Sequence, residues 1–329
     1  MSSPRTNLFR QALFSCLPLI VLAFAATASE RVHLTPKFSA GEIFRYSIES
    51  RTTSTGKTTA PVVNPEGGSR SSESIRMVVR LEVLGVSPAG QAHLRATYEK
   101  SSAQSESDAL DLQAASFADQ FNRLEGSSFE FTIEPGANFA DAQVLTTAPA
   151  APSPPQPALS FLQGLPTGAG FPQKGIAIGQ KWTSERPIAG ALLSGLIWRA
   201  ESTYLRDEEC GSSANSKSGA DPSRPSPAAG ASQCAVILTR SEILRRGSTQ
   251  SDATPDEYRR NGLRTSGTWT GSGESLDSIS LSTGLLVTST QSSTQSMDYL
   301  ITSASNGSNI HHVGKAESQS EISLVPDQP

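Results

Sequence analysis

Apolar side chains occupy every second position over a long stretch of this chain, and this alternation restricts the fold more than any other feature. The run consists of Ile75, Met77, Val79, Leu81 and Val83. Because successive side chains of a β-strand point to opposite faces, the run predicts a strand with one buried and one solvated face. Residues 94–98 repeat the pattern after a Ser-Pro-Ala-Gly turn, so the two strands are expected to pair as a hairpin.

The alternation recurs along the rest of the chain. Residues 44–48 and 129–133 show it clearly, and the second half favours strands over 194–207, 233–246, 263–274, 276–282, 285–303 and 317–325. Only 36% of the residues are hydrophobic and 6% aromatic, which is typical of strands with one wet face. The sequence therefore predicts a mainly β fold, with one large curved antiparallel sheet and one or two helices packed on it.

Two stretches have helical rather than alternating spacing. Within residues 104–124 the apolar positions recur at roughly helical intervals, at Leu110, Leu112, Phe117, Phe121 and Leu124. A short second helix is expected at 157–164. We expect the longer helix to pack on the concave face of the sheet.

Segments rich in small and polar residues separate these elements. Residues 51–74 and 148–158 are predicted linkers, the second of them proline-rich and extended. Residues 211–232 are predicted to form the tip of a long loop, since they offer almost nothing to bury.

The proline-rich linker divides the chain into a first β-rich half at 29–147 and a second at 159–329. A short echo links the two halves, because Gly41–Ser47 and Gly179–Ser184 each place an aromatic residue soon after a glycine at the start of a strand. Whether the halves arose by duplication stays open on this evidence.

The first 28 residues have the order of a secretory signal peptide. Arg5 and Arg10 form a basic head, an apolar core follows, and Ala26-Thr27-Ala28 supplies small residues for cleavage. The mature protein is therefore expected to be periplasmic or secreted, with no stable membrane span after cleavage. Acylation at Cys16 is the alternative, but most of the apolar run follows this residue, which disfavours a lipoprotein site.

Two cysteines remain in the mature chain, Cys210 and Cys234. In an exported protein an isolated pair predicts a disulfide, which here would close the loop 211–233. The alternative, a redox-active pair, is disfavoured because such cysteines usually lie in a Cys-x-x-Cys turn.

The sequence offers no recognisable catalytic, cofactor or metal site, so none is predicted. It has no Gly-x-Ser-x-Gly turn between strand and helix, and nothing marks a partner for the strand acids Glu130 and Glu134. His311 and His312 are adjacent, so a regular strand would point them to opposite faces, and solvated loop histidines are expected.

Charge and tryptophan content restrict the partners. The formal net charge of −4 argues against nucleic acid, which requires a basic surface. The tryptophans are expected to anchor the core, with a platform for sugar or lipid as the alternative reading; they are Trp182, Trp198 and Trp269.

Four short motifs resemble a group of uncharacterised exported bacterial β-rich proteins, a domain of unknown function. They are Phe38–Tyr46, Ile178–Trp182, Ser282–Leu286 and Met297–Tyr299. The order of elements is also similar to periplasmic lipid-carrier folds, in which a curved antiparallel sheet wraps a helix. The resemblance implies an apolar hollow beside the helix and brings no catalytic residues with it.

These observations favour a non-enzymatic exported binding protein whose ligand is a lipid or another apolar molecule. A structural or envelope module that binds another protein is the alternative. A hydrolase with an unrecognised site is a third hypothesis, disfavoured by the missing catalytic residues.

Overall fold

In the computed structural model the described residues are 31–59, 68–108, 118–134, 143–145, 171–172, 174–188, 190–211, 232–247 and 253–325. They belong to one compact unit, Arg31–Pro329. The predicted signal peptide at 1–28, the linker at 148–158 and the helix expected at 157–164 lie outside the described residues.

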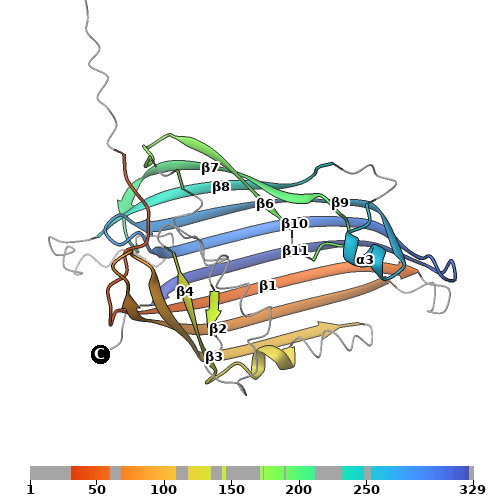
Figure 1. Ribbon diagram of the computed structural model, residues 1–329, viewed down its shortest axis with the longest axis horizontal. Coiled ribbons are helices and arrows are strands. Elements are labelled where there is room, and N and C mark those ends of the chain that lie inside the picture. The colour runs from red at the N-terminus through yellow and green to blue at the C-terminus, as the bar shows by residue number, and fades with distance from the viewer. Residues whose placement is uncertain are drawn as a thin grey trace, which may run out of the picture. The chain divides into compact units, whose positions relative to one another are not determined.

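Eleven strands of the described residues form a single open antiparallel sheet. Figure 1 shows its long strands side by side. Their order across the sheet is β5-β4-β3-β2-β1-β11-β10-β9-β8-β7-β6. The first group of strands comprises β1 (Ile43–Thr59), β2 (Gly68–Val86), β3 (Ala92–Ser107), β4 (Ser128–Ile133) and β5 (Gln143–Leu145).

The second group comprises β6 (Lys181–Pro187), β7 (Leu196–Glu209), β8 (Gln233–Arg245), β9 (Leu263–Ser280), β10 (Leu286–Ser303) and β11 (Asn309–Val325). A five-residue helix, α3 (Asp256–Arg260), precedes β9. The mainly β fold class is therefore confirmed. In the described part of the chain, no helix has the length and apolar character needed to cross a membrane.

The two groups meet where β1 pairs with β11. This ladder runs from Arg45, opposite Val325, to Thr59, opposite His311. Both predicted halves thus contribute strands to one continuous sheet. A duplication that relates 29–147 to 159–329 stays a proposal.

The hairpin predicted between β2 and β3 is confirmed by their pairing, which extends from Ser71–Ser107 to Val86–Ala92. The Ser87 amide donates to the Gln91 carbonyl across the turn. Gly90 there has a φ of 86°, a conformation that glycine adopts without the steric cost that a side chain imposes.

The alternating side chains bury one face of the sheet at one end of its strands. Tyr46, Ile48, Met77, Val79 and Ile322 lie side by side on this face and belong to one large apolar cluster. Ile48 and Val79 are completely buried, and full burial of one such side chain stabilises by about 1.5–3 kcal/mol. We call this face the inner face and the opposite one the outer face.

A smaller apolar cluster lies near the opposite end of the second group of strands. Leu196 on β7 and Ile243 on β8 form its sheet side, together with Leu193 and Ala253 from the connections. Trp198, Trp269 and Tyr299 pack against it and are partly buried.

The predicted linker at 51–74 is wrong for most of its length, because β1 continues to Thr59 and β2 starts at Gly68. These serine- and threonine-rich segments pair with each other from Arg51–Ser74 to Lys57–Gly68. The segments lack apolar alternation, yet backbone hydrogen bonds to paired neighbours suffice to keep a polar segment extended within a wide sheet.

The predicted start of the first helix at residue 104 is also wrong. Residues 104–107 belong to β3, where Gln104 pairs with Ser74 of β2. Helical backbone occurs at 118–122 among the described residues, and 109–117 lie outside them. Phe121 and Leu124 are nevertheless buried against the inner-face cluster, so the expected packing of a helix on this face is confirmed.

Two other boundaries differ from the prediction. The segments expected at 263–274 and 276–282 are one strand, β9, and β11 begins at Asn309 rather than near residue 317. Residues 270–275 are mostly Thr, Gly and Ser, and in residues 309–316 the apolar Ile310 and Val313 are three positions apart. Neither stretch has apolar alternation, so the sequence pattern stops before the backbone pairing does.

Candidate binding site on the inner face

Between the two apolar clusters the inner face is made of hydroxyl, amide and glycine residues. They form two neighbouring rows across β11, β10, β9 and β8. The first row is Ser320–Gln291–Ser275–Thr239, and the second is Ser318–Ser293–Gly273–Ser241. We call these residues the polar floor.

The rows arise from register alone. Each member lies directly opposite the next in its ladder, and residues two apart on a strand share a face. On β1 the rows continue to Ser50 and Thr52, and on β7 to Ser202 and Ala200. The floor is therefore assembled from segments that are far apart in the sequence.

A cavity of about 540 Å³ lies over the polar floor. The floor residues line it, together with Ser184, Trp198 and Ala200. Most floor side chains are partly buried rather than exposed. Most of the residues that line the cavity are thus polar, with one aromatic side chain at its margin.

The hydroxyl groups near the cavity form short hydrogen bonds within the sheet. Ser202 and Thr239 are 2.9 Å apart between their hydroxyl oxygens, and Thr52 and Ser318 are 3.0 Å apart. Each hydroxyl offers one donor and two acceptor sites. One such bond therefore leaves further hydrogen-bonding capacity directed at the cavity or at water.

Glycines keep the surface low where neighbouring strands approach. A Cβ atom at Gly273 would lie 2.9 Å from the Ser241 hydroxyl and 3.2 Å from the Ser292 carbonyl. At Gly271 it would lie 2.9 Å from the Thr294 carbonyl. A side chain at Gly271 would collide with the Thr294 backbone, whereas one at Gly273 would require the Ser241 hydroxyl to move, so both positions favour glycine.

The tryptophans are core anchors, as the sequence predicted, and one has a second role. Trp182 packs edge-on against Phe171 with ring centroids 5.8 Å apart. Trp269 donates its indole N–H to the Gln295 side chain over 3.0 Å. Trp198 packs on the smaller cluster and also lines the cavity.

A buried carboxyl group lies at the border of the polar floor. Asp277 is 6% exposed and accepts hydrogen bonds from Ser289 (2.6 Å) and Ser275 (3.0 Å). Burial raises the pKa of this carboxyl, and the two hydroxyl donors offset only part of that effect.

The charged residues at the cavity margin are mostly paired. Glu185 lies 2.5 Å from Arg246, and Glu274 lies 3.0 Å from Arg240. Arg186, on the exposed edge strand β6, has no ion-pair partner among the described residues. The floor itself carries no charged side chain.

A larger hollow, of about 690 Å³, is lined mostly by outer-face residues of β1, β2, β3, β9, β10 and β11. Its walls include Glu49 and Arg76, which form an ion pair of 3.7 Å and whose side chains are 60% and 76% exposed. Such exposed walls are largely solvated and offer a ligand little desolvated surface. The inner-face cavity is for this reason the better candidate.

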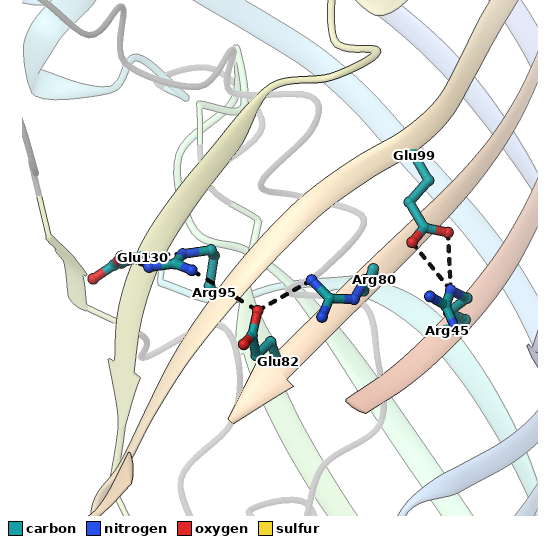
Figure 2. Close-up of polar contacts among 6 residues, drawn as sticks. All are labelled: Arg45, Arg80, Glu82, Arg95, Glu99 and Glu130. Atoms are coloured by element: carbon teal, nitrogen blue, oxygen red, sulfur yellow. Dashed lines mark hydrogen bonds and ion pairs between the residues drawn. The ribbon is translucent and has the colours of Figure 1, made fainter. Parts of the chain in front are cut away.

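Ion pairs also link the outer face of β1 to β4. Figure 2 shows Arg45 with Glu99 at 3.0 Å, and a chain in which Glu82 lies between Arg80 and Arg95. Arg95 continues the chain to Glu130 at 2.8 Å.

Glu130 also pairs with His93 at 2.9 Å, and the hydrogen bond from Arg95 lowers the pKa of Glu130. Opposite charges alternate along this network, so it holds strands together rather than presenting an uncompensated charge. Glu134 accepts a hydrogen bond from Gln91.

The adjacent histidines lie on β11, not in the predicted loop. His311 on the outer face lies 2.8 Å from Asp298. His312 on the inner face stacks on Tyr299, with ring centroids 5.0 Å apart, and its Nδ1 is 2.9 Å from the Thr58 hydroxyl. Burial lowers the pKa of His312. No group of three His, Cys, Asp or Glu residues in the described ranges is placed to hold a metal ion.

The predicted disulfide between Cys210 and Cys234 is present. It joins the residue after β7 to the second residue of β8, with the two Cα atoms 5.0 Å apart. Cys234 is fully buried. Of the loop 211–233 that it closes, residues 212–231 lie outside the described residues.

Fold and site together define a protein with one wide antiparallel sheet and a polar cavity on its core-bearing face. No protein-family model matches the chain, and no curated protein matches it. The chain is similar to a solved structure described as "Lipid-protein interactions in lipovitellin", with 13% sequence identity and a TM-score of 0.41. The similarity covers 88% of this chain and 26% of that one. A likeness this distant carries no information about function.

Proposed function

We propose that this chain is a non-enzymatic exported protein that binds a small ligand on the inner face of its sheet. The observation that carries the proposal is the cavity of about 540 Å³ over the polar floor. Its size is within the range of ligand pockets, which span roughly 300–1,000 Å³. It lies between two packed apolar clusters, so its floor is held in place by the core on both sides.

The exported location is part of this proposal. A disulfide is consistent with an extracellular or periplasmic location, since such bonds persist where the surroundings are oxidising. The signal peptide predicted at 1–28 favours the same location on sequence grounds.

The sequence favoured a lipid or another apolar ligand, and the lining of the cavity narrows this idea. Trp198 and Ala200 are its apolar contributors, whereas the floor residues are polar. A wholly apolar ligand would remove these hydroxyls from water without replacing their hydrogen bonds, at a cost of about 1–3 kcal/mol for each group left unpaired. We therefore propose an amphipathic ligand, such as a lipid with its polar part against the floor.

Native mass spectrometry of the purified mature protein tests the proposal, together with titration by an amphipathic fluorescent probe. The expected result is a co-purifying lipid mass or saturable probe binding at one site. The variant Ala200→Phe should reduce binding because it fills the cavity.

The matched control is Thr183→Phe, which adds the same ring on the outer face of the neighbouring strand and should leave binding intact. Clean spectra and no probe binding by folded protein would refute the proposal. Equal binding by Ala200→Phe and the control would place the ligand elsewhere.

A further inference from the structure

We infer that the polar floor recognises a hydroxyl-rich group, namely a sugar or polyol, either free or as the head group of a lipid. This inference rests on the proposed binding function and names the chemistry of the ligand at the same site. The observation behind it is the two-row arrangement of Ser, Thr and Gln side chains that lines the cavity.

The side chains of the polar floor can both donate and accept hydrogen bonds. Serine and threonine hydroxyls and the Gln291 amide can each donate and accept. Sugar and polyol hydroxyls can also donate and accept, so the floor side chains and the ligand hydroxyls can form hydrogen bonds with each other. An alkyl chain has neither capacity and would leave the floor residues unpaired.

The polar floor is electrically neutral. No floor residue is charged, and Glu185 and Glu274 at the margin are each engaged by an arginine. The buried Asp277 is already held by Ser289 and Ser275. Arg186, which also lines the cavity, has no ion-pair partner among the described residues, but it lies at the margin on β6 and not in the floor. The floor itself is thus matched to a neutral, hydrogen-bonding group rather than to a cation.

The polar floor is a wide surface with an aromatic ring at its margin. The four strands of the floor span about 15 Å from centre to centre, at a strand spacing of about 4.8 Å. Gly273 keeps this area low, and Trp198 rises at its margin as a partly buried ring. A flat hydrogen-bonding surface beside an aromatic ring fits a sugar ring, which has polar edges and apolar C–H faces.

The test is calorimetric titration of the mature protein with glycerol and with neutral mono-, di- and trisaccharides. A second arm uses phosphatidylcholine vesicles with and without a glycolipid, which distinguishes a free sugar from a lipid head group. We expect saturable binding in at least one arm, together with a change in tryptophan fluorescence.

The variants Thr239→Val and Ser241→Ala each remove a floor hydroxyl and should weaken that binding by about 5- to 10-fold. The matched controls are Thr294→Val and Ser272→Ala, whose hydroxyls lie on the outer face of β10 and β9. These controls should bind like the parent protein, and thermal melting verifies that all four variants fold.

The outcomes separate the two proposals. Binding of the amphipathic probe without any response to sugars, polyols or glycolipid would overturn this inference and leave the proposed function standing. Failure of both the probe and the hydroxylated ligands would overturn the proposed function itself. Sugar binding that is equally weakened by inner-face and outer-face variants would also contradict the inference.

Discussion

The Ser289 hydroxyl donates a 2.6 Å hydrogen bond to the Asp277 carboxyl group at the border between the apolar core and the polar floor. Both residues lie in the last row of the core, where Ser289 pairs with Ile322 and Asp277 pairs with Ile237. The next row toward the cavity contains Ser275 and Gln291. The pair thus joins a buried acid to the hydrogen-bonding network of the proposed site.

Replacement of this acid should change how stability depends on pH. Burial raises the pKa of Asp277 above its ordinary value of 3.8, so the folded state holds a proton that the unfolded state has released over the interval between the two values. Its stabilising contribution is therefore complete below the unfolded pKa and is lost as pH rises through the folded pKa. Asp277→Asn should remove this loss.

The measurement is the free energy of unfolding in urea at a series of pH values, for the parent and for Asp277→Asn. The control is Glu317→Gln, which changes an exposed carboxylate on the outer face of β11 and should follow the parent curve. Parallel curves for the parent and Asp277→Asn would show that the buried carboxyl does not control this pH dependence.

The disulfide should contribute to stability mainly by restricting the unfolded chain. Cys210 and Cys234 are separated by 24 positions, for which the chain-entropy relation gives about 3.5 kcal/mol. The double variant Cys210→Ser with Cys234→Ala should therefore melt at a lower temperature than the oxidised protein. A reducing agent should destabilise the parent and leave the variant unchanged; two free thiols in denatured, unreduced parent would contradict this.

The imidazole of His312 lies across a pair of glycines on neighbouring strands. A Cβ atom at Gly314 would be 2.7 Å from its Nε2 atom, and one at Gly56 would be 3.0 Å from its Cε1 atom. Gly314→Ala should displace the ring from Tyr299 and destabilise the fold. In a His312→Ala background, Gly314→Ala should lower the free energy of unfolding by a smaller amount. The coupling energy between the two positions should be about 0.5–2 kcal/mol.

A double-mutant cycle of thermal or urea unfolding measures this coupling. Gly307→Ala serves as the comparison for a glycine with open space around it, although its φ of 67° makes alanine strained for backbone reasons alone. Its effect should be independent of His312. Equal costs of Gly314→Ala in both backgrounds would show that the ring does not require the glycine.

Replacing Glu130 by glutamine should lower the free energy of unfolding slightly at neutral pH. The hydrogen bond from Arg95 lowers the pKa of Glu130 below its ordinary value of 4.5, so its contribution is present above that value and is lost as pH falls through the folded pKa. Because the network lies at the surface, Glu130→Gln should cost about 0.5 kcal/mol at neutral pH. Unfolding at a series of pH values below 7 should show the cost shrink as Glu130 becomes protonated in the folded protein, and added salt should reduce the cost at neutral pH.

The sequence predicted the β-rich fold best where apolar residues alternate. The run from Ile75 to Val83 became the buried face of β2, because a period of two permits one buried face only in a strand. The same reasoning failed at 51–74, where serine and threonine occupy both faces. Such residues are equally common in loops, so only pairing with β11 and β2 defines these segments as strands.

The candidate site was missed for a related reason. Ser275, Gln291 and Ser320 have no unusual spacing in the sequence, and each occurs among many other polar residues. A possible signal is that such residues alternate in phase with the buried positions of the same strand, as Ser320 does with Ile322. That signal gives the face of a strand but not which strands are neighbours.

The sequence by itself determined the period of the strands, the turn between β2 and β3, and the pair of cysteines available for a disulfide, because these depend on residues close together or on composition. The tertiary structure alone decided that β1 lies beside β11, that the polar segments extend the sheet, and that the floor residues meet in two rows. The physical reason is that side-chain alternation is local, whereas ladder pairing depends on the combined stability of all the strands.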